Sequence, residues 1–227
     1  MTDNYALILA SGSGKRFNSD IPKQFMSFGG KTILEHSVEI FERNPYIKGI
    51  IVVITPDYYS QALSVLAKYS KVLKVLKGGK TRKDSSFIGV NAIDDDSANV
   101  LLHDCARPLL SQKVLNDCIK AIDIHDAVAV ASDVTDTVIE VKDGYIKNIP
   151  ERKSLMNVQT PQCFRVSLIK KAHQMALDDN NFTDDCGLVI KNSLSDIYII
   201  NGDRSNMKIT YPNDLVLAEQ IFNNINY

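Results

Sequence analysis

Apolar strand-like segments alternate with amphipathic helix-like segments along residues 5–131, and this alternation limits the possible folds more than any other feature of the sequence. The run from Ile50 to Thr55 is almost entirely apolar, which is typical of a strand covered by helices on both faces of a parallel sheet. Leu34, Val38 and Phe41 recur at helical spacing, with glutamates on the other faces. Alternating strands and helices form right-handed βαβ units, so we expect an α/β fold with a doubly wound, mostly parallel sheet. The predicted strands are 5–10, 50–55, 72–76, 100–102 and 127–131, and the predicted helices between them are 32–43, 57–69, 83–93 and 111–123.

The alternation stops after residue 131, and a hairpin signal follows. Two short alternating segments, 137–141 and 145–149, flank Asp143-Gly144, and Asp-Gly in that place is a strong signal for a tight β-hairpin. Because an isolated hairpin is only marginally stable, we predict that residues 133–163 form a β-arm that packs on a second subunit of a homodimer. An edge hairpin lying on its own sheet is the alternative. Further elements are predicted as helices at 165–177, from Asp184 and from Pro212, and as a strand at 197–200.

Size and composition place the chain among single-domain proteins without a long polyanionic partner. Its 227 residues are interpreted as one domain, 1–227. The net charge of −1 and the pI near 6.4 provide no basic field, so we expect neither nucleic acid nor a membrane surface as a partner. The four cysteines lack metal-binding spacing, and no apolar run approaches about 18 residues, so a cytoplasmic location is expected.

The loop after the first predicted strand carries the clearest chemical signal. Ser11 to Gly14 are small residues that let backbone N–H groups approach phosphate oxygens, and the cations Arg16 and Lys23 follow. A plain turn with solvated basic side chains is the alternative, but Pro22 fixes the backbone beside Lys23. A dinucleotide-binding fingerprint is excluded because Phe17 stands at its third glycine position. A Walker A loop is excluded because arginine, not serine or threonine, follows the Gly-Lys pair.

Two further polar loops, 78–85 and 103–108, also follow predicted strands. Ligands in open α/β sheets bind outside the carboxyl ends of the strands, so these loops and the first one are expected to meet at one edge. Several cations around the carboxylate of Asp104 suit a triphosphate whose Mg²⁺ is held partly by protein and partly by phosphate oxygens. His103 is interpreted as a strand-end residue with local hydrogen bonds rather than a base. Cys105 is interpreted as a small packed residue rather than a nucleophile.

Motifs spread over nearly the whole chain resemble one enzyme family. They are Leu-Ala-Ser-Gly-Ser-Gly-Lys-Arg at 9–16 with Pro-Lys-Gln-Phe at 22–25, Gly-Gly-Lys-Thr-Arg-Lys-Asp-Ser at 78–85, His-Asp-Cys-Ala-Arg-Pro at 103–108, Thr-Asp-Thr-Val at 135–138, Gln-Thr-Pro-Gln at 159–162, Phe-Thr-Asp-Asp at 182–185 and Asn-Met-Lys-Ile-Thr at 206–210. The set resembles the cytidylyltransferases that make 4-diphosphocytidyl-2-C-methyl-D-erythritol in the non-mevalonate isoprenoid pathway. This resemblance implies a nucleotidyltransferase-type doubly wound domain, CTP as a substrate, Mg²⁺, and a homodimer with swapped β-arms.

The matching positions imply roles for individual residues. By resemblance, Arg16, Lys23 and Lys208 are catalytic, and Asp104 is the Mg²⁺ ligand. Because the family is acidic where this chain has Lys80, the base contact there is expected to use the backbone. The positions that match contacts to the sugar phosphate are Arg107, Thr137 and Lys208. Two more, Arg152 and Thr183, match residues expected to reach its phosphate from the partner's arm. The positions that match CTP contacts are Ala10, Ser11, Gly12, Ser13, Gly14, Gly79, Lys80, Arg82, Ser85 and Ala106.

The sequence leaves the acceptor open. The motifs at 78–85, 103–108 and 182–185 favour 2-C-methyl-D-erythritol 4-phosphate. The D-ribitol-5-phosphate cytidylyltransferases of teichoic acid and capsule synthesis are the alternative. Cys186 stands where those enzymes have the cysteine of a Thr-Asp-Ala-Cys motif, and the aromatic residue often found before Gln-Thr-Pro-Gln is missing here. Another polyol phosphate is also compatible with the pattern. A third alternative is a non-catalytic nucleotide-binding regulator, but such a protein is expected to lack Lys23, Asp104 or Lys208, and all three are present.

Overall fold

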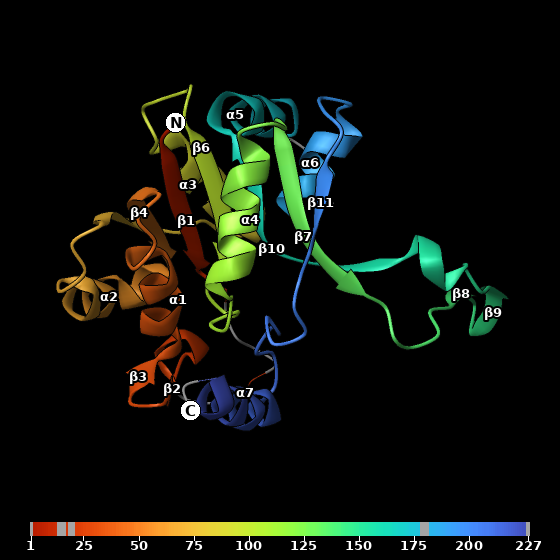
Figure 1. Ribbon diagram of the computed structural model, residues 1–227, viewed down its shortest axis with the longest axis horizontal. Helices are drawn as coiled ribbons and strands as arrows, with labels where there is room; N and C mark the ends of the chain where they lie inside the picture. The colour runs from red at the N-terminus through yellow and green to blue at the C-terminus, as the bar shows by residue number, and fades with distance from the viewer. Residues whose placement is uncertain (1, 13–16, 18–20, 178–181, 226–227) are drawn as a thin grey trace.

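The computed structural model describes residues 2–12, 17, 21–177 and 182–225 (Figure 1). Its centre is a seven-stranded sheet in the order β11-β7-β10-β6-β1-β4-β5. Neighbouring strands run parallel except at β10, which is antiparallel to both β6 and β7. The predicted doubly wound, mostly parallel α/β fold is confirmed.

The central strands are β1 (Asn4–Ala10), β4 (Ile47–Ile54), β5 (Val72–Lys77), β6 (Asn99–Asp104), β7 (Ala127–Asp133), β10 (Met156–Arg165) and β11 (Tyr198–Asn201). The helices are α1 (Ile33–Glu42), α2 (Tyr59–Leu66), α3 (Arg82–Asn91), α4 (Gln112–Ile122), α5 (Val166–Met175), α6 (Asp185–Lys191) and α7 (Pro212–Ile225). Shorter elements are the strand pair β2 (Ser27–Phe28) and β3 (Lys31–Thr32) and the 3₁₀ helices Lys23–Phe25, Pro56–Tyr58 and Arg152–Ser154. The helix predicted at 57–69 is therefore shorter and begins with a 3₁₀ turn. None of the helices in these described ranges is both long and apolar enough to cross a membrane.

Apolar side chains bury both faces of the sheet, as the near-continuous apolar strands predict. In β1, Ala6 and Ile8 belong to a core cluster that includes side chains of α1, α2 and α4. Leu7 and Leu9, which point to the opposite face, belong to a second cluster with side chains of α3, α5 and α6. Because both faces are covered, the loops at the carboxyl ends of the strands remain as the place for a polar ligand.

A capping box fixes the start of α3 beside the end of β5. The side chain of Thr81 accepts a hydrogen bond from the backbone N–H of Asp84, and the Asp84 carboxylate accepts one from the backbone N–H of Thr81, both at 3.0 Å. These two bonds satisfy N–H groups that the first turn of a helix otherwise leaves without a partner. They also place Arg82 in the first turn, at the carboxyl edge of the sheet.

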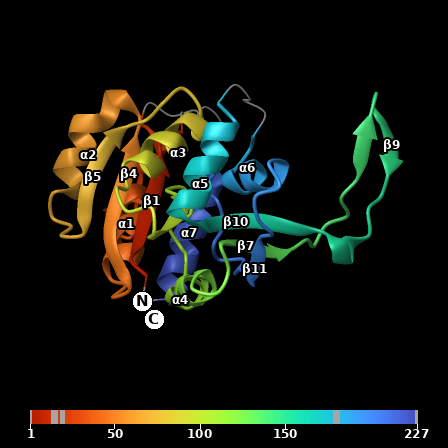
Figure 2. The same ribbon diagram turned by 90° about the horizontal axis from the view of Figure 1, so that it is seen from above.

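The hairpin β8 (Glu140–Lys142) and β9 (Tyr145–Asn148) extends away from the body of the domain (Figures 1 and 2). Asp143 and Gly144 have φ values of 53° and 80°, which is the left-handed geometry that the Asp-Gly signal predicts for a tight hairpin turn. The structure differs from the predicted extent of the arm at its C-terminal end. Residues 156–163 belong to β10 and pair with β6 and β7 inside the central sheet.

Candidate active site

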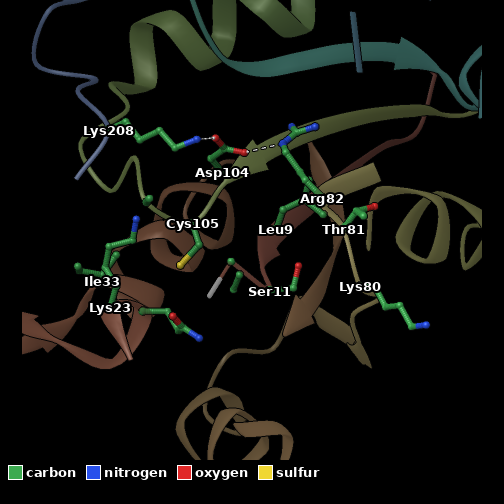
Figure 3. Close-up of a pocket in the computed structure, with 14 residues that line it drawn as sticks. Leu9, Ser11, Lys23, Ile33, Lys80, Thr81, Arg82, Asp104, Cys105 and Lys208 are labelled. Atoms are coloured by element: carbon green, nitrogen blue, oxygen red, sulfur yellow. Dashed lines mark hydrogen bonds and ion pairs between the residues drawn. The ribbon is translucent and has the colours of Figure 1, made fainter. Parts of the chain in front are cut away.

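A cavity of about 340 Å³ lies at the carboxyl ends of β1 and β6 (Figure 3). It is lined by the loops that follow these strands, by the start of α3, by the 3₁₀ helix that begins at Lys23, and by Lys208 from the C-terminal part of the chain. The predicted convergence of polar loops at one edge is confirmed. The predicted site residues that line the cavity are Ala10, Ser11, Gly12, Lys23, Lys80, Arg82, Asp104, Ala106 and Lys208.

The charged side chains of the cavity are organised around Asp104. Lys208 Nζ lies 2.6 Å from Asp104 Oδ2, and Arg82 Nε lies 3.3 Å from Asp104 Oδ1 (Figure 3). Burial raises the pKa of the Asp104 carboxyl group, but the charges of Arg82 and Lys208 outweigh this effect and hold the pKa well below its usual range. The carboxylate is therefore ionised at neutral pH. With Lys23 and Lys80, the described lining residues present four cations and one carboxylate, which suits a polyanion.

Lys23 connects two distant segments of the chain at the cavity. Its Nζ donates a 2.7 Å hydrogen bond to the backbone carbonyl of Ile209, the residue after Lys208. The preceding Pro22 has a φ of −59°, as its ring requires, and directs the chain into the short helix that carries Lys23. Two predicted catalytic cations that are 185 positions apart in the sequence are thus brought to the same side of the cavity.

The glycine-containing loop at 78–85 lies against the loop after β1. Ser11 Oγ donates to Ser85 Oγ at 2.7 Å, and the backbone N–H of Gly79 donates to the same Ser85 oxygen at 3.2 Å. A Cβ at Gly78 would lie 2.6 Å from the Cβ of Ser11, and one at Gly79 would lie 2.3 Å from the Cβ of Asp84. Only glycine permits this approach. Gly79 and Ser85 do not line the cavity but shape its wall.

His103 and Cys105, whose side-chain types serve as bases and nucleophiles in other sites, are unsuited to that chemistry here. His103 is buried, its two ring nitrogens lie 2.9 Å from the Arg107 carbonyl and 3.1 Å from Thr160 Oγ1, and burial lowers its pKa to about 4. Burial raises the pKa of the Cys105 thiol to about 12. The predicted roles of His103, local hydrogen bonding, and of Cys105, packing, are confirmed.

The donor set fits a divalent cation that is shared with a phosphate ligand. Among the described residues, no group of three or more His, Cys, Asp or Glu side chains could hold a metal ion by itself. Asp104 supplies a single ionised carboxylate in a cavity rich in cations. Magnesium is commonly held in this way, by one or two carboxylates together with phosphate oxygens and water.

Comparisons with known proteins agree with this geometry. Residues 5–224 match the family described as IspD: 2-C-methyl-D-erythritol 4-phosphate cytidylyltransferase. The chain is 38% identical over 229 residues to the enzyme of that name from Clostridium novyi, a match that covers 99% of both chains. It is 38% identical to the one from Thermosipho melanesiensis, covering 98% of this chain and 100% of the relative. The crystal structure of 4-diphosphocytidyl-2C-methyl-D-erythritol synthase from Anaerococcus prevotii is similar with a TM-score of 0.87 and 31% identity, covering 98% of this chain and 99% of that one.

The chain belongs to the IspD family. Apart from Lys208, the residues that the IspD resemblance implies for the sugar phosphate lie outside the described cavity lining. Arg107 donates through Nη1 to the Asn206 carbonyl at 2.7 Å. Thr137 and Arg152 are exposed on the arm, where Arg152 Nη2 lies 3.4 Å from Thr137 Oγ1. Thr183 lies just before α6 in the body of the domain, so its predicted place on the arm is wrong.

Three predicted residues of this IspD-family site, Ser13, Gly14 and Arg16, lie outside the described residues. Five lining residues are absent from the predicted set: Leu9, Gln24, Ile33, Thr81 and Cys105, of which Gln24 and Thr81 can make polar contacts through an amide and a hydroxyl. Thr81 has a usable sequence signal, which is the capping-box spacing to Asp84. Gln24 has only a weak one, its place in the Pro-Lys-Gln-Phe motif, because a glutamine in a turn is normally solvated.

Proposed function

We propose that the protein transfers the cytidylyl group of CTP to 2-C-methyl-D-erythritol 4-phosphate and releases pyrophosphate. The observation that carries this proposal is the cavity whose described lining holds four cations and the carboxylate of Asp104, two of the cations in contact with that carboxylate, in a chain that belongs to the IspD family. Relatives that match nearly the whole chain are named for this activity. The ribitol 5-phosphate alternative is therefore not favoured.

The reaction proposed is an in-line displacement at the α-phosphorus of CTP. An oxygen of the acceptor phosphate forms the new P–O bond, the bond between the α-phosphorus and the bridging oxygen breaks, and pyrophosphate carries away the electron pair. The nucleophile is already an anion, so no protein base is required, in keeping with a buried, neutral His103 and a protonated Cys105. Catalysis then comes from positioning two polyanions and from stabilising the charge at phosphorus, for which Lys23 and Lys208 are placed.

We also propose that Mg²⁺ takes part, held by Asp104 together with phosphate oxygens of the nucleotide. When bound, it would neutralise charge on the phosphates of CTP. In the present structure Lys208 contacts the same carboxylate.

We infer that the arm packs on a second copy of the chain and that the two copies share their sites. Four apolar side chains of the hairpin region are highly exposed: Val141 (59%), Tyr145 (71%), Ile146 (59%) and Ile149 (59%). Such a surface on a projecting hairpin with few contacts of its own favours a protein partner. Thr137 and Arg152 lie on this arm, away from the cavity of their own chain, so a partner's arm would supply these two contacts to the sugar phosphate.

The proposed location is the cytoplasm. The structure contains four free cysteines, Cys105, Cys118, Cys163 and Cys186, of which the first three are buried. Reduced thiols without disulfide bonds are usual in that compartment.

The function is tested by pyrophosphate release from CTP and Mg²⁺ with 2-C-methyl-D-erythritol 4-phosphate, with D-ribitol 5-phosphate, and without an acceptor. We expect turnover with the first acceptor only. Turnover only with ribitol 5-phosphate would keep the fold and the chemistry but change the acceptor. Absence of turnover with both would contradict the proposed substrate class.

A further inference from the structure

Behind the cavity, α3, α5 and α6 enclose polar side chains that the mechanism leaves unused. Asp185, Ser86 and His173 are buried, and none of them lines the cavity. Ser86 Oγ donates a hydrogen bond to Asp185 Oδ1, while His173 Nε2 lies 3.1 Å from Ser86 Oγ and 3.4 Å from Asp185 Oδ1. A carboxylate buried so completely is costly unless a charged partner compensates it.

That partner is Arg82. Its Nη1 donates a 2.6 Å hydrogen bond to Asp185 Oδ2. Burial raises the pKa of Asp185, but the charge of Arg82 and the contacts with His173 and Ser86 outweigh the effect and hold the pKa at about 2. Asp185 is therefore a buried anion at neutral pH, paired with an arginine of the cavity wall.

The same guanidinium group contacts Asp104. Arg82 Nε donates to Asp104 Oδ1 at 3.3 Å (Figure 3). One side chain therefore bridges the Asp185 carboxylate behind the cavity and the Asp104 carboxylate inside it. A guanidinium is planar and its N–H groups have fixed directions, so a hold on Nη1 also fixes where Nε points. Asp185 itself is held by Gln162, whose Oε1 accepts hydrogen bonds from the backbone N–H groups of Asp185 and Cys186 at 3.1 and 3.2 Å.

The balance of charge around Arg82 also connects Asp185 with Asp104. Because Arg82 is shared between two carboxylates, Asp104 keeps negative charge with which to attract another cation, and in this structure that cation is Lys208 at 2.6 Å. If Asp185 lost its charge, the positive charge of Arg82 would be compensated by Asp104 alone. Arg82 would then compete more strongly with any other cation for that carboxylate.

We propose that Asp185 is a positioning residue for Asp104: by holding Arg82 between the two carboxylates, it keeps Asp104 oriented and negative enough to take a divalent cation together with CTP. This inference rests on the proposed function, because it uses Asp104 as the metal-binding carboxylate. It extends the site to α6 and gives a role to the second aspartate of the Phe-Thr-Asp-Asp motif and to the last glutamine of Gln-Thr-Pro-Gln.

Isothermal titration calorimetry of CTP, with Mg²⁺ and with EDTA, tests the proposal in the wild type, Asp185→Asn and Asp117→Asn. Asp117 is the control because its carboxylate pairs with Lys113 at 2.9 Å on α4 and contacts neither Arg82 nor Gln162. We expect Asp185→Asn to reduce the Mg²⁺-dependent gain in CTP affinity about tenfold or more, the scale typical of residues that orient metal ligands, with CTP affinity in EDTA nearly unchanged. The control should stay within about twofold of the wild type.

Equal Mg²⁺-dependent gains in the wild type and a folded Asp185→Asn protein would overturn the inference. An equal loss of CTP affinity with Mg²⁺ and with EDTA would also overturn it, because that result indicates a structural role only. If Asp185→Asn does not fold, Arg82→Lys replaces it, because lysine keeps the charge but cannot bridge both carboxylates. Arg82 also lines the cavity, so this variant is judged by the ratio of CTP affinity with Mg²⁺ to CTP affinity with EDTA. We expect this ratio to fall, and an unchanged ratio would overturn the proposal.

Asp104→Asn separates the inference from the proposed function on which it rests. This variant should abolish the Mg²⁺-dependent gain. If it retains the gain of the wild type, the proposed metal site fails and the inference fails with it. A negative result at Asp185 alone leaves the proposed function standing.

Discussion

Replacing Asp185 with asparagine should destabilise the protein, and the loss should shrink as the pH falls. Asp185 is fully buried, and its contacts with Arg82 hold its pKa at about 2, whereas an aspartate in an unfolded chain titrates near about 3.9. Because the folded value is the lower one, the unfolded chain takes up a proton first when the pH falls. The ionised carboxylate therefore stabilises the folded state above about pH 5, and this contribution is lost as the pH falls toward about 2.

The contacts of Asp185 give the size of the effect. Lowering a pKa from about 3.9 to about 2 is worth about 2.6 kcal/mol at pH 7, and about half of that remains at pH 3. Removing one partner of a buried ion pair costs about 3–5 kcal/mol in total, because Arg82 then faces a neutral amide. The free energy of unfolding of Asp185→Asn should therefore be about 3–5 kcal/mol lower than that of the wild type at pH 7. The difference should be about 1.3 kcal/mol smaller at pH 3.

Urea unfolding followed by circular dichroism at pH 7, 5, 4 and 3 measures this difference. Asp117→Asn is a matched control, because Asp117 pairs with Lys113 at 2.9 Å on the exposed face of α4. Its loss should change the free energy of unfolding by no more than about 0.5 kcal/mol. If the difference between the wild type and Asp185→Asn is the same at pH 7 and pH 3, Asp185 is not an ionised, paired carboxylate in the folded protein and the reasoning is refuted.

Three further predictions concern activity. In a steady-state assay of pyrophosphate release, Lys23→Ala should lower kcat about 100-fold or more, which is the scale of one preorganised electrostatic donor. A raised KM for CTP with a normal kcat would instead show that Lys23 binds CTP but does not stabilise the transition state. Mixed dimers of Lys23→Ala and Arg152→Ala chains should regain activity that neither variant has alone, and no recovery would argue against sites shared between subunits. Cys105→Ala should retain kcat within about threefold, because its thiol is protonated and packed; a loss of several orders of magnitude would restore Cys105 as a candidate nucleophile.

Much of the fold is predictable because its elements obey local rules. The apolar runs of β1, β4 and β7 and the amphipathic pattern of α1 follow from burial on one or both faces, and the Asp143-Gly144 turn follows from backbone sterics. The central strand β10 does not follow these rules. Its segment contains Gln159, Thr160, Pro161 and Gln162, a composition that does not indicate a buried strand.

Those polar side chains are buried because their partners come from elsewhere in the chain. Gln159 Oε1 accepts a hydrogen bond from Asn206 at 3.0 Å, and Thr160 Oγ1 accepts one from the backbone N–H of Asp104 at 3.1 Å. Gln162 Nε2 donates to Asp184 at 2.8 Å. Sequence patterns of short period carry no information on such long-range pairs. The strand β10 therefore could not be predicted from the sequence and is seen only in the tertiary structure.

The sequence by itself determined the alternating α/β architecture, the hairpin turn, and the residue types that meet at the carboxyl edge of the sheet, because each depends on neighbours within a few positions. Only the tertiary structure decided which charges act together. Arg82, at the start of α3, lies between Asp104 at the end of β6 and Asp185 at the start of α6, and Lys23 reaches the segment of Lys208 through the Ile209 carbonyl. Electrostatic interactions depend on distance in space, and the fold brings together Arg82 and Asp185, 103 positions apart, and Lys23 and Ile209, 186 positions apart.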